Sequence, residues 1–321
     1  MRPGKATERR TVPDPQPAPS LLRPEELTTA VRARSEAATT SGALVSMPTR
    51  VHEIVDGGTR FVVRVTENVA RKAAAAAADP GGDPFAPPWE PDLLVGAVSS
   101  SHVVLLNKFN VLPEHVLLVT RDYRPQTELP DAADLEAALI ALAAGNGLVF
   151  YNGGPEAGAS QPHKHLQRVP LPLGPGPEPL PFAPLLAAAE PMHGSVGHCP
   201  SLPFAHAITP VPAAWWQAPA PHAGAALSAL QALWQALGHG GDGGQQPAPY
   251  NLLLTREWMW LVPRSRGEAA GIGVNALGYA GALLVRDHAQ LERLQRTGPL
   301  RLLAATAAPA NRQWRRPPAA Q

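Results

Sequence analysis

Two histidines and a glutamine alternate in the segment 163–167, which reads HKHLQ. Alternate side chains of an extended strand lie on one face, so His163, His165 and Gln167 are expected to point together. A histidine can attack phosphorus at neutral pH, because its ordinary pKa of about 6.5 leaves much of the ring as the free base. The pattern therefore indicates group transfer in two steps through a covalent phosphoramidate, with His165 as nucleophile.

The segment before this motif, NGGPEAGASQ (152–161), is rich in glycine and ends with Ser160 and Gln161. Glycine lets the backbone approach a phosphate group closely and donate N–H groups to it. The attacking histidine needs its second ring nitrogen held by a hydrogen bond. The backbone carbonyls of Asn152 to Gly154 are the predicted acceptors.

Residue types and spacing leave two other interpretations of HKHLQ open. One is an edge strand whose polar side chains lie in water, and the other is a zinc site that uses both histidines. Four further histidines follow no trusted zinc spacing and are expected to be ordinary loop residues. They are His193, His198, His206 and His222.

Composition describes an ordinary soluble protein of 321 residues with a net charge of +1. Such a balance gives no reason to expect a nucleic-acid or membrane partner. The only cysteine, Cys199, excludes an internal disulfide and fits a reducing compartment. The N-terminus is rich in Arg and Pro but lacks the apolar region of a secretory signal. We expect a cytoplasmic protein, with an organelle transit peptide as the alternative.

Hydrophobic patterns and breakers predict the elements that position the motif. A helix is expected from Leu21, with Pro24 in its first turn and Gly42 at its end, and another over 129–146. Residues 73–91 are expected to form a surface loop, and 223–237 a helix. The expected strands are 49–55 paired with 59–69 across a glycine turn, 97–109 paired with 115–123, the strands on either side of 152–161, 250–256, 258–265 and 278–287.

The chain holds 38 prolines, more than twice the usual share of about 5%. Many lie in 170–221, where we expect irregular structure anchored by Trp215 and Trp216. The predicted fold is α+β, an antiparallel sheet with packed helices and this long Pro-rich insertion. The predicted divisions are a disordered tail (1–20), a single domain (21–305) made of an N-terminal part (21–170), the Pro-rich excursion (170–221) and a C-terminal part (222–305), and a disordered basic tail (306–321).

Five blocks of the sequence, in this order, resemble the ATP adenylyltransferase family, also called diadenosine tetraphosphate phosphorylases, within the histidine-triad-like superfamily. The resemblance covers about 21–302 and implies a histidine-triad-like sheet. The blocks are FVVRV (61–65), LLNKFNVLPEHVLLVTRDY (105–123), YNGGPEAGASQPHKHLQ (151–167), YNLLLTREWMWLVPRS (250–265) and NALGYAGALLV (275–285).

The resemblance implies that His165 attacks the α-phosphorus of diadenosine tetraphosphate and expels ATP, after which phosphate takes the AMP to give ADP. It assigns His163 and Gln167 to the catalytic group, with Gln167 as a neutral donor to the α-phosphate. Lys108 is expected to provide a point charge for the polyphosphate. The residues implied to line the nucleotide site are Arg60, Asn107, Lys108, Asn152, Gly158, Ala159, Ser160, Gln161, Thr255 and Arg264.

The chain departs from the family pattern at several of these positions. Arg60 stands where many relatives have lysine, which keeps the charge but changes its geometry. Ala159 and Gly153 replace common serines, Pro162 a common aspartate, and Glu156 a common asparagine. The loss of one hydroxyl donor is expected to cost about 0.5–1.5 kcal/mol of binding without removing the reaction.

Other functions remain open from the sequence. A hydrolase could use water as acceptor, although that branch usually has histidine where this chain has Gln167. A nucleotide-binding or zinc protein without activity is a second alternative, and a sugar nucleotide or adenosine 5′-phosphosulfate could replace the dinucleotide as substrate. We expect no tightly bound cofactor and no protein metal site. A divalent cation such as Mg²⁺ could accompany the polyphosphate, and the oligomeric state stays open.

Overall fold

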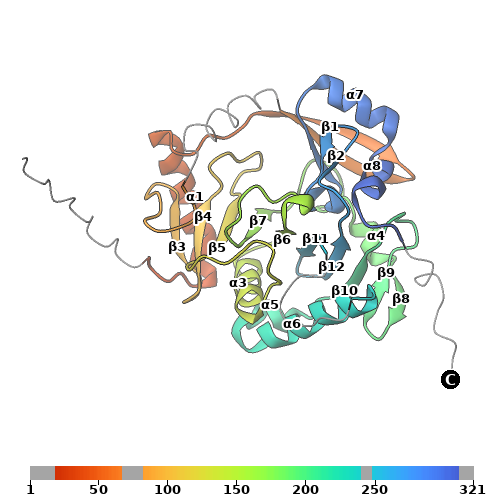
Figure 1. The fold of residues 1–321 in the computed structure, drawn as a ribbon. Helices are drawn as coiled ribbons and strands as arrows, with labels where there is room; N and C mark the ends of the chain where they lie inside the picture. The colour runs from red at the N-terminus through yellow and green to blue at the C-terminus, as the bar shows by residue number, and fades with distance from the viewer. Residues whose placement is uncertain (1–18, 67–81, 240–247, 311–321) are drawn as a thin grey trace, which may run out of the picture.

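The computed structural model describes residues 19–66, 82–239 and 248–310, and a ten-stranded sheet forms its centre (Figure 1). Every neighbouring pair in this sheet is antiparallel, as predicted. The order across the sheet is β3 (Leu94–Ala97), β4 (His102–Leu106), β5 (Val116–Thr120), β7 (His165–Pro170), β6 (Gly147–Gly153), β11 (Tyr250–Leu254), β12 (Trp258–Pro263), β10 (Ala207–Pro210), β9 (Val196–His198) and β8 (Glu190–His193).

A smaller sheet packs beside it, and its first two strands form the predicted hairpin. β1 (Thr49–Asp56) and β2 (Thr59–Thr66) are joined by Gly57 and Gly58, both with positive φ, which a two-residue turn of this kind requires. β15 (Ala282–Val285) adds to β2 in parallel. A two-stranded ribbon of β13 (Glu268–Ala269) and β14 (Ile272–Gly273) lies separately.

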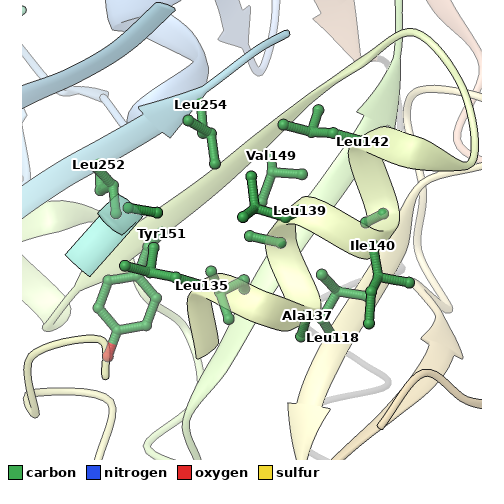
Figure 2. Close-up of a cluster of buried hydrophobic side chains, with 14 of the residues drawn as sticks. Leu118, Leu135, Ala137, Leu139, Ile140, Leu142, Val149, Tyr151, Leu252 and Leu254 are labelled. Carbon is green, nitrogen blue, oxygen red and sulfur yellow. The ribbon is translucent and has the colours of Figure 1, made fainter. Parts of the chain in front are cut away.

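Helices cover one face of the large sheet. The best-packed is α3 (Ala132–Ala143), which begins at the N-cap Asp131 and presents its leucines to β6 and β11 (Figure 2). Both α1 and α6 contribute to the same hydrophobic cluster. The other described helices are α1 (Pro24–Ser41), α4 (Ala183–Ala187), α5 (Ala213–Gln217), α6 (Pro219–Ala236), α7 (His288–Thr297) and α8 (Pro299–Thr306), with 3-10 turns η1 (Pro155–Ala157) and η2 (Ala276–Ala280).

The opposite face of the large sheet has two hydrophobic clusters with polar residues between them. Gln167 of β7 pairs with Leu117 of β5 on one side and with Phe150 of β6 on the other. Leu117 belongs to the cluster that contains Phe85, whereas Phe150 belongs to the one that contains β2 and β15. Since Leu166 points into the helical face, His165 and Gln167 face the gap between these two clusters.

The Pro-rich excursion is more regular than predicted, so that prediction was wrong. Residues 170–221 contain α4, α5, the start of α6 and the strands β8, β9 and β10, which extend one end of the large sheet. Its prolines occupy positions that regular structure tolerates: Pro184 and Pro219 lie in the first turns of α4 and α6, and Pro191 is in the edge strand β8. Trp215 is buried, as predicted.

Two predicted boundaries also need correction. The C-terminal tail was expected to begin at 306, but Thr306 is fully buried, and Ala307 and Ala308 pair with Arg264 and Pro263. Within the predicted surface loop 73–91, Phe85 and Trp89 are buried against the sheet. The predicted disorder of 1–18 and 311–321, and the loop residues 73–81, lie outside the described residues. The division of 21–305 into parts stays a prediction.

Among the described helices, none combines the length and apolarity that a bilayer span requires.

Candidate active site

His165 lies at the start of β7, with 3% of its surface exposed. Its Nδ1 donates to the backbone carbonyl of His163 at 2.8 Å, so the neutral ring has its lone pair on Nε2. The predicted acceptors in 152–154 were therefore wrong, because the motif supplies its own carbonyl. Burial lowers the pKa of His165 to about 4, and the bond to the His163 carbonyl only partly opposes this effect. At neutral pH the ring of His165 is therefore the free base.

His163 is fully buried, and oxygen atoms face both of its ring nitrogens. Nδ1 lies 2.6 Å from a carboxylate oxygen of Asp83, and Nε2 lies 2.7 Å from the Thr120 carbonyl. Phe85 contacts both histidines, with ring centroids 6.1 Å from His163 and 4.9 Å from His165. The two histidines thus share a face, as predicted. Both ring nitrogens of His163 are engaged within the fold, and its catalytic role stays a prediction.

Neither of the other interpretations of HKHLQ fits this geometry. β7 is a central strand between β5 and β6, so it is not a polar edge. Both nitrogens of His163 and the Nδ1 of His165 are engaged with protein oxygens. Within the described part of the chain, no three His, Cys, Asp or Glu side chains are placed to hold a metal ion.

A buried glutamine, Gln126, ties His165 to the neighbouring strand β6. Its side-chain oxygen accepts from the backbone N–H of His165 at 2.7 Å. Its amide nitrogen donates to the carbonyls of Asn152 and His165 at 2.9 and 3.1 Å. These three bonds span the point where β6 and β7 separate, and so they fix the backbone of His165 relative to the glycine-rich loop.

Asn152 and Arg264 form the hydrogen bonds that hold the glycine-rich loop in place. The Asn152 side-chain oxygen accepts from Asn251 and from the backbone of Ala276. The guanidinium of Arg264, 3% exposed, donates to Asn251, to the Ala157 carbonyl and to further carbonyls. Burial lowers the pKa of Arg264. Its position is structural in this protein, and direct contact with nucleotide stays a prediction.

The loop itself needs glycine at 158. Gly158 has φ +95°, and a Cβ there would lie 2.8 Å from the Cβ of Asn275. Next to it, Ala159 donates its N–H back to the Gly154 carbonyl, whereas Ser160 is exposed and Gln161 half-buried. The loop therefore presents Ser160 and Gln161 beside the motif, which agrees with their predicted role as donors to phosphate; the role itself stays a prediction.

Gln167 is linked to the predicted site residue Asn107 through His115. The Nε2 of His115 lies 2.9 Å from the side-chain oxygen of Gln167, and its Nδ1 lies 3.1 Å from the amide nitrogen of Asn107. Lys108, the next residue, forms an ion pair with Glu90 at 3.0 Å, and both side chains are 44% exposed. Asn107 and Gln167 therefore belong to one polar group, with Lys108 at its rim.

Of the remaining predicted site residues, Thr255 lies apart from this group. Thr255 is in the turn between β11 and β12, where its hydroxyl accepts from the N–H groups of Glu257 and Trp258. It is four residues, about 13 Å of strand, from Asn251 at the loop end of β11. Thr255 holds a turn and is not part of the group around His165. Arg60, on β2 of the small sheet, pairs with Glu53 at 2.7 Å and donates to the Pro175 carbonyl. Its contact with nucleotide stays a prediction.

Sequence reasoning missed Asp83, Phe85, His115, Gln126 and Asn251. His115 and Asn251 had a usable signal, since each lies within one of the five sequence blocks and is polar next to apolar strand residues. Gln126 had a weaker one, because it lies just after the block 105–123. Asp83 and Phe85 had none, because they lie in a Gly/Pro-rich stretch that pattern analysis describes as a loop.

Comparison with known proteins supports the same family. Residues 17–188 match the family model described as the Ap4A phosphorylase N-terminal domain, and residues 200–309 match the ATP adenylyltransferase C-terminal domain. Diadenosine 5′,5‴-P1,P4-tetraphosphate phosphorylase 2 of Saccharomyces cerevisiae is 32% identical over 240 residues, which are 66% of this chain and 71% of that protein. Protein APA1 of the same yeast is 33% identical over 233 residues, 64% and 70% of the two chains.

The fold agrees with that relationship. The crystal structure of yeast Ap4A phosphorylase Apa2 superposes with a TM-score of 0.75 at 28% identity, covering 91% of this chain and 97% of that one. The same yeast protein in complex with Ap4A gives a TM-score of 0.73, covering 90% and 100%. Because the N-terminal family model matches more than half of the length of this protein, the chain belongs to the Ap4A phosphorylase family.

Proposed function

We propose that the protein is a diadenosine tetraphosphate phosphorylase, or ATP adenylyltransferase, that transfers AMP to inorganic phosphate through an adenylyl-His165 intermediate. In the first step Nε2 of His165 forms a bond to the α-phosphorus, and the bond from that phosphorus to the bridging oxygen breaks. The electron pair leaves with ATP. In the second step a phosphate oxygen attacks the same phosphorus, the P–N bond breaks, and ADP is released.

One observation carries this proposal: the buried ring of His165 is held by its Nδ1, and among the described residues none hydrogen-bonds its Nε2. Because Nδ1–H is bound to the His163 carbonyl, the free lone pair is on Nε2. With the pKa near 4, no proton has to be removed before attack. Once the adenylyl group is attached the ring becomes cationic, and the carbonyl at 2.8 Å then stabilises Nδ1–H more strongly.

The polar group beside His165 suits a nucleotide phosphate. Gln167 can donate amide N–H groups, which stabilise charge on the α-phosphoryl oxygens without adding a charge of their own. Ser160, Gln161 and Lys108 are accessible for the rest of the polyphosphate. A purine dinucleotide, ATP, ADP and phosphate are therefore the proposed small-molecule partners, and the relatives named for Ap4A support this choice.

We also propose that a divalent cation such as Mg²⁺ enters with the polyphosphate and is not held by the protein. The cationic side chains among the predicted site residues are few and engaged, since Lys108 is paired with Glu90 and Arg264 donates to protein oxygens. Four phosphates exceed that charge. Turnover measured against Mg²⁺ with and without EDTA tests this, and full activity in excess EDTA would contradict it.

For the compartment we propose the cytoplasm. The single cysteine, Cys199, is buried, and burial raises the pKa of its thiol to about 12, so it is suited to remain reduced and unreactive. Imaging of the full chain with a C-terminal fluorescent tag tests the proposal, and accumulation in an organelle would contradict it.

The function is tested by turnover of diadenosine tetraphosphate with and without phosphate, with the nucleotide products resolved. Phosphate-dependent formation of ATP and ADP by the wild type, lost in His165→Ala and retained in the exposed control His193→Ala, is the expected result. Phosphate-independent AMP and ATP would identify a hydrolase. No turnover would reject this substrate and direct the assay to sugar nucleotides and adenosine 5′-phosphosulfate.

The intermediate can be trapped by leaving out phosphate. Substrate labelled in the adenosine moiety should transfer label to the wild type and to His193→Ala but not to His165→Ala. The label should be released by acid and survive alkali, as a phosphoramidate does. Label that survives acid would contradict attachment to a histidine nitrogen.

A further inference from the structure

Three side chains from different strands form a continuous hydrogen-bonded chain beside the nucleophile. Asn107 follows β4, His115 precedes β5, and Gln167 lies on β7. The amide nitrogen of Asn107 is 3.1 Å from Nδ1 of His115, and Nε2 of His115 is 2.9 Å from the side-chain oxygen of Gln167. His115 is only 6% exposed, so this chain is shielded from water on its central member.

The chemistry of the three groups gives the chain a direction. An amide nitrogen can only donate, so Nδ1 of His115 accepts from Asn107. The neutral imidazole then has its proton on Nε2, which donates to the Gln167 oxygen. With that oxygen engaged by His115, the amide N–H groups of Gln167 point the other way. Asn107 thus determines the tautomer of His115, and His115 determines the orientation of Gln167.

We propose that His115 is a positioning residue for the transfer reaction, which fixes the amide of Gln167 so that its N–H groups, and not its oxygen, face the α-phosphoryl group. The proposal rests on the proposed function, since it assigns the phosphoryl group as the partner of Gln167. An amide rotated by half a turn would present its oxygen to phosphate oxygens, and that contact is repulsive. His115 removes this alternative before substrate binds.

The backbone around the chain keeps its geometry fixed. The N–H of Asn107 donates to the carbonyl of His115 at 2.9 Å, which continues the pairing of β4 with β5. Gln167 pairs with Leu117 and with Phe150, and the ring of Phe150 lies 6.0 Å from that of His115. Asn107, His115 and Gln167 therefore lie on or next to paired strands, which fix their backbone positions. The orientation of the Gln167 amide then depends on its side-chain hydrogen bond with His115.

Three substitutions of His115 separate positioning from packing. His115→Phe keeps the ring and removes the donor. His115→Gln places an amide N–H near the former Nε2, whereas His115→Asn, its shorter homologue, reaches only the Nδ1 position. We expect kcat for phosphorolysis to fall about 10- to 100-fold in His115→Phe and His115→Asn, with KM changed less than about threefold, and to recover in His115→Gln. Equal losses in all three variants would overturn the proposal.

A double-mutant cycle with Gln167→Ala tests whether His115 acts through Gln167. If it does, His115→Phe should lower kcat in the wild-type background and should have no further effect in Gln167→Ala. Additive losses would show that His115 acts independently, and would overturn the proposal. Thermal unfolding of each variant identifies any loss that is merely structural.

A second readout does not depend on turnover. In protein labelled with ¹⁵N-histidine, the His115 resonances, assigned with His115→Gln, should show protonated Nε2 and unprotonated Nδ1 at pH 7.5. The reverse tautomer would overturn the proposed direction of the chain even if the enzyme is active. If the protein proves inactive toward diadenosine tetraphosphate while the tautomer is as expected, the proposed substrate fails and the positioning chain stands.

Discussion

Two buried histidines of this protein have almost the same surroundings and opposite uses. His165 and His206 are each 3% exposed, and burial lowers the pKa of each to about 4. Each donates from Nδ1 to the carbonyl two residues before it, His165 to His163 at 2.8 Å and His206 to Phe204 at 2.9 Å. Burial, pKa and tautomer therefore do not distinguish a nucleophile from a structural residue.

The other ring nitrogen distinguishes them. Nε2 of His206 accepts the backbone N–H of Cys199 at 2.8 Å, so its lone pair is used inside the fold. Among the described residues, none hydrogen-bonds Nε2 of His165. One histidine thus completes a loop, and the other keeps a lone pair for chemistry. A shifted pKa therefore indicates a functional histidine only when the hydrogen-bond partners of both ring nitrogens are also considered.

The largest expected effects come from the same substitution at both positions. His165→Leu should lower turnover by at least about 10⁴-fold, because the proposed nucleophile is lost, and should cost about 1 kcal/mol of stability, because only the His163 carbonyl loses its partner. His206→Leu should leave kcat within a few-fold and cost about 2–3 kcal/mol of stability, because the Cys199 N–H and the Phe204 carbonyl lose their partner. Steady-state kinetics and urea unfolding measure both. Similar losses of activity in the two variants would break the comparison.

Two lysines show a similar contrast between a side chain used within the fold and one available to a ligand. Lys164, between the two motif histidines, is fully buried and lies 2.6 Å from Asp134, whereas the Lys108–Glu90 pair is 3.0 Å apart and 44% exposed. Burial by itself would raise the pKa of Asp134, but the hydrogen bond with His102 and the charge of Lys164 outweigh it and hold the pKa below its ordinary range. The buried pair anchors the motif to α3, and the exposed pair can open for a ligand.

Asp134→Asn should therefore destabilise the protein by about 3–5 kcal/mol, since it leaves the charge of Lys164 buried with the Leu129 carbonyl but without a counter-charge. The matched change Glu90→Gln at the exposed pair should cost less than about 1 kcal/mol. Urea unfolding of both variants at pH 7 gives the two values. A loss of less than about 1 kcal/mol in Asp134→Asn would mean that water or another group compensates Lys164, and the contrast between the pairs would fail.

The pH dependence of stability can test the shared property of the two histidines. Their folded pKa of about 4 lies below the ordinary value of 6.5, so the unfolded chain binds more protons between these values. The contribution of these two neutral histidines to the free energy of unfolding is complete above pH 6.5 and decreases as the pH falls towards 4. Each of the two histidines should lower the free energy of unfolding by about 2 kcal/mol when the pH is lowered from 7 to 5.

Urea unfolding at pH 7 and pH 5 measures this loss in the wild type and in His206→Leu. The variant should lose about 2 kcal/mol less than the wild type, because leucine does not titrate. Adenylylation of His165 by the folded enzyme should stay nearly constant from pH 7 to pH 5.5, since its ring remains unprotonated. A decline in that rate with a midpoint near pH 6.5 would contradict the lowered pKa.

The sheet, the helix α3 and the alternation of the histidine motif on β7 could be predicted from the sequence because each has a local signal. Alternation and glycine turns mark the strands, and HKHLQ marks the site. The partners of the motif could not be predicted in this way, because Gln126 and Asp83 meet it across 39 and 80 positions of chain. Thr255 shows the converse error: a matching block placed it at the site, but strand direction places it at the far end of β11.

The structure of the Pro-rich excursion (170–221) could not be predicted from local signals either. Prolines usually interrupt regular structure, but Pro184 and Pro219 of this segment occupy first helical turns, where the missing N–H has no cost. Whether a proline breaks or begins an element depends on the residues that pack after it. Here Trp215 and the apolar side of α6 supply that packing in the core below β10 and β12.

The smallest expected effect concerns the exposed pair at the rim of the site. If Lys108 attracts the polyphosphate, Lys108→Ala should raise KM for diadenosine tetraphosphate about tenfold, with little change in kcat or in thermal stability. Glu90→Gln, which releases Lys108 from its partner, should lower KM by about two- to threefold, because an exposed ion pair costs less than about 1 kcal/mol to open. Both shifts should shrink at high salt, which screens exposed charges. Opposite signs of the two KM changes would place Lys108 with His165, among the side chains kept available for ligand, whereas an unchanged KM in both variants would place it with Lys164, among those that serve only the fold.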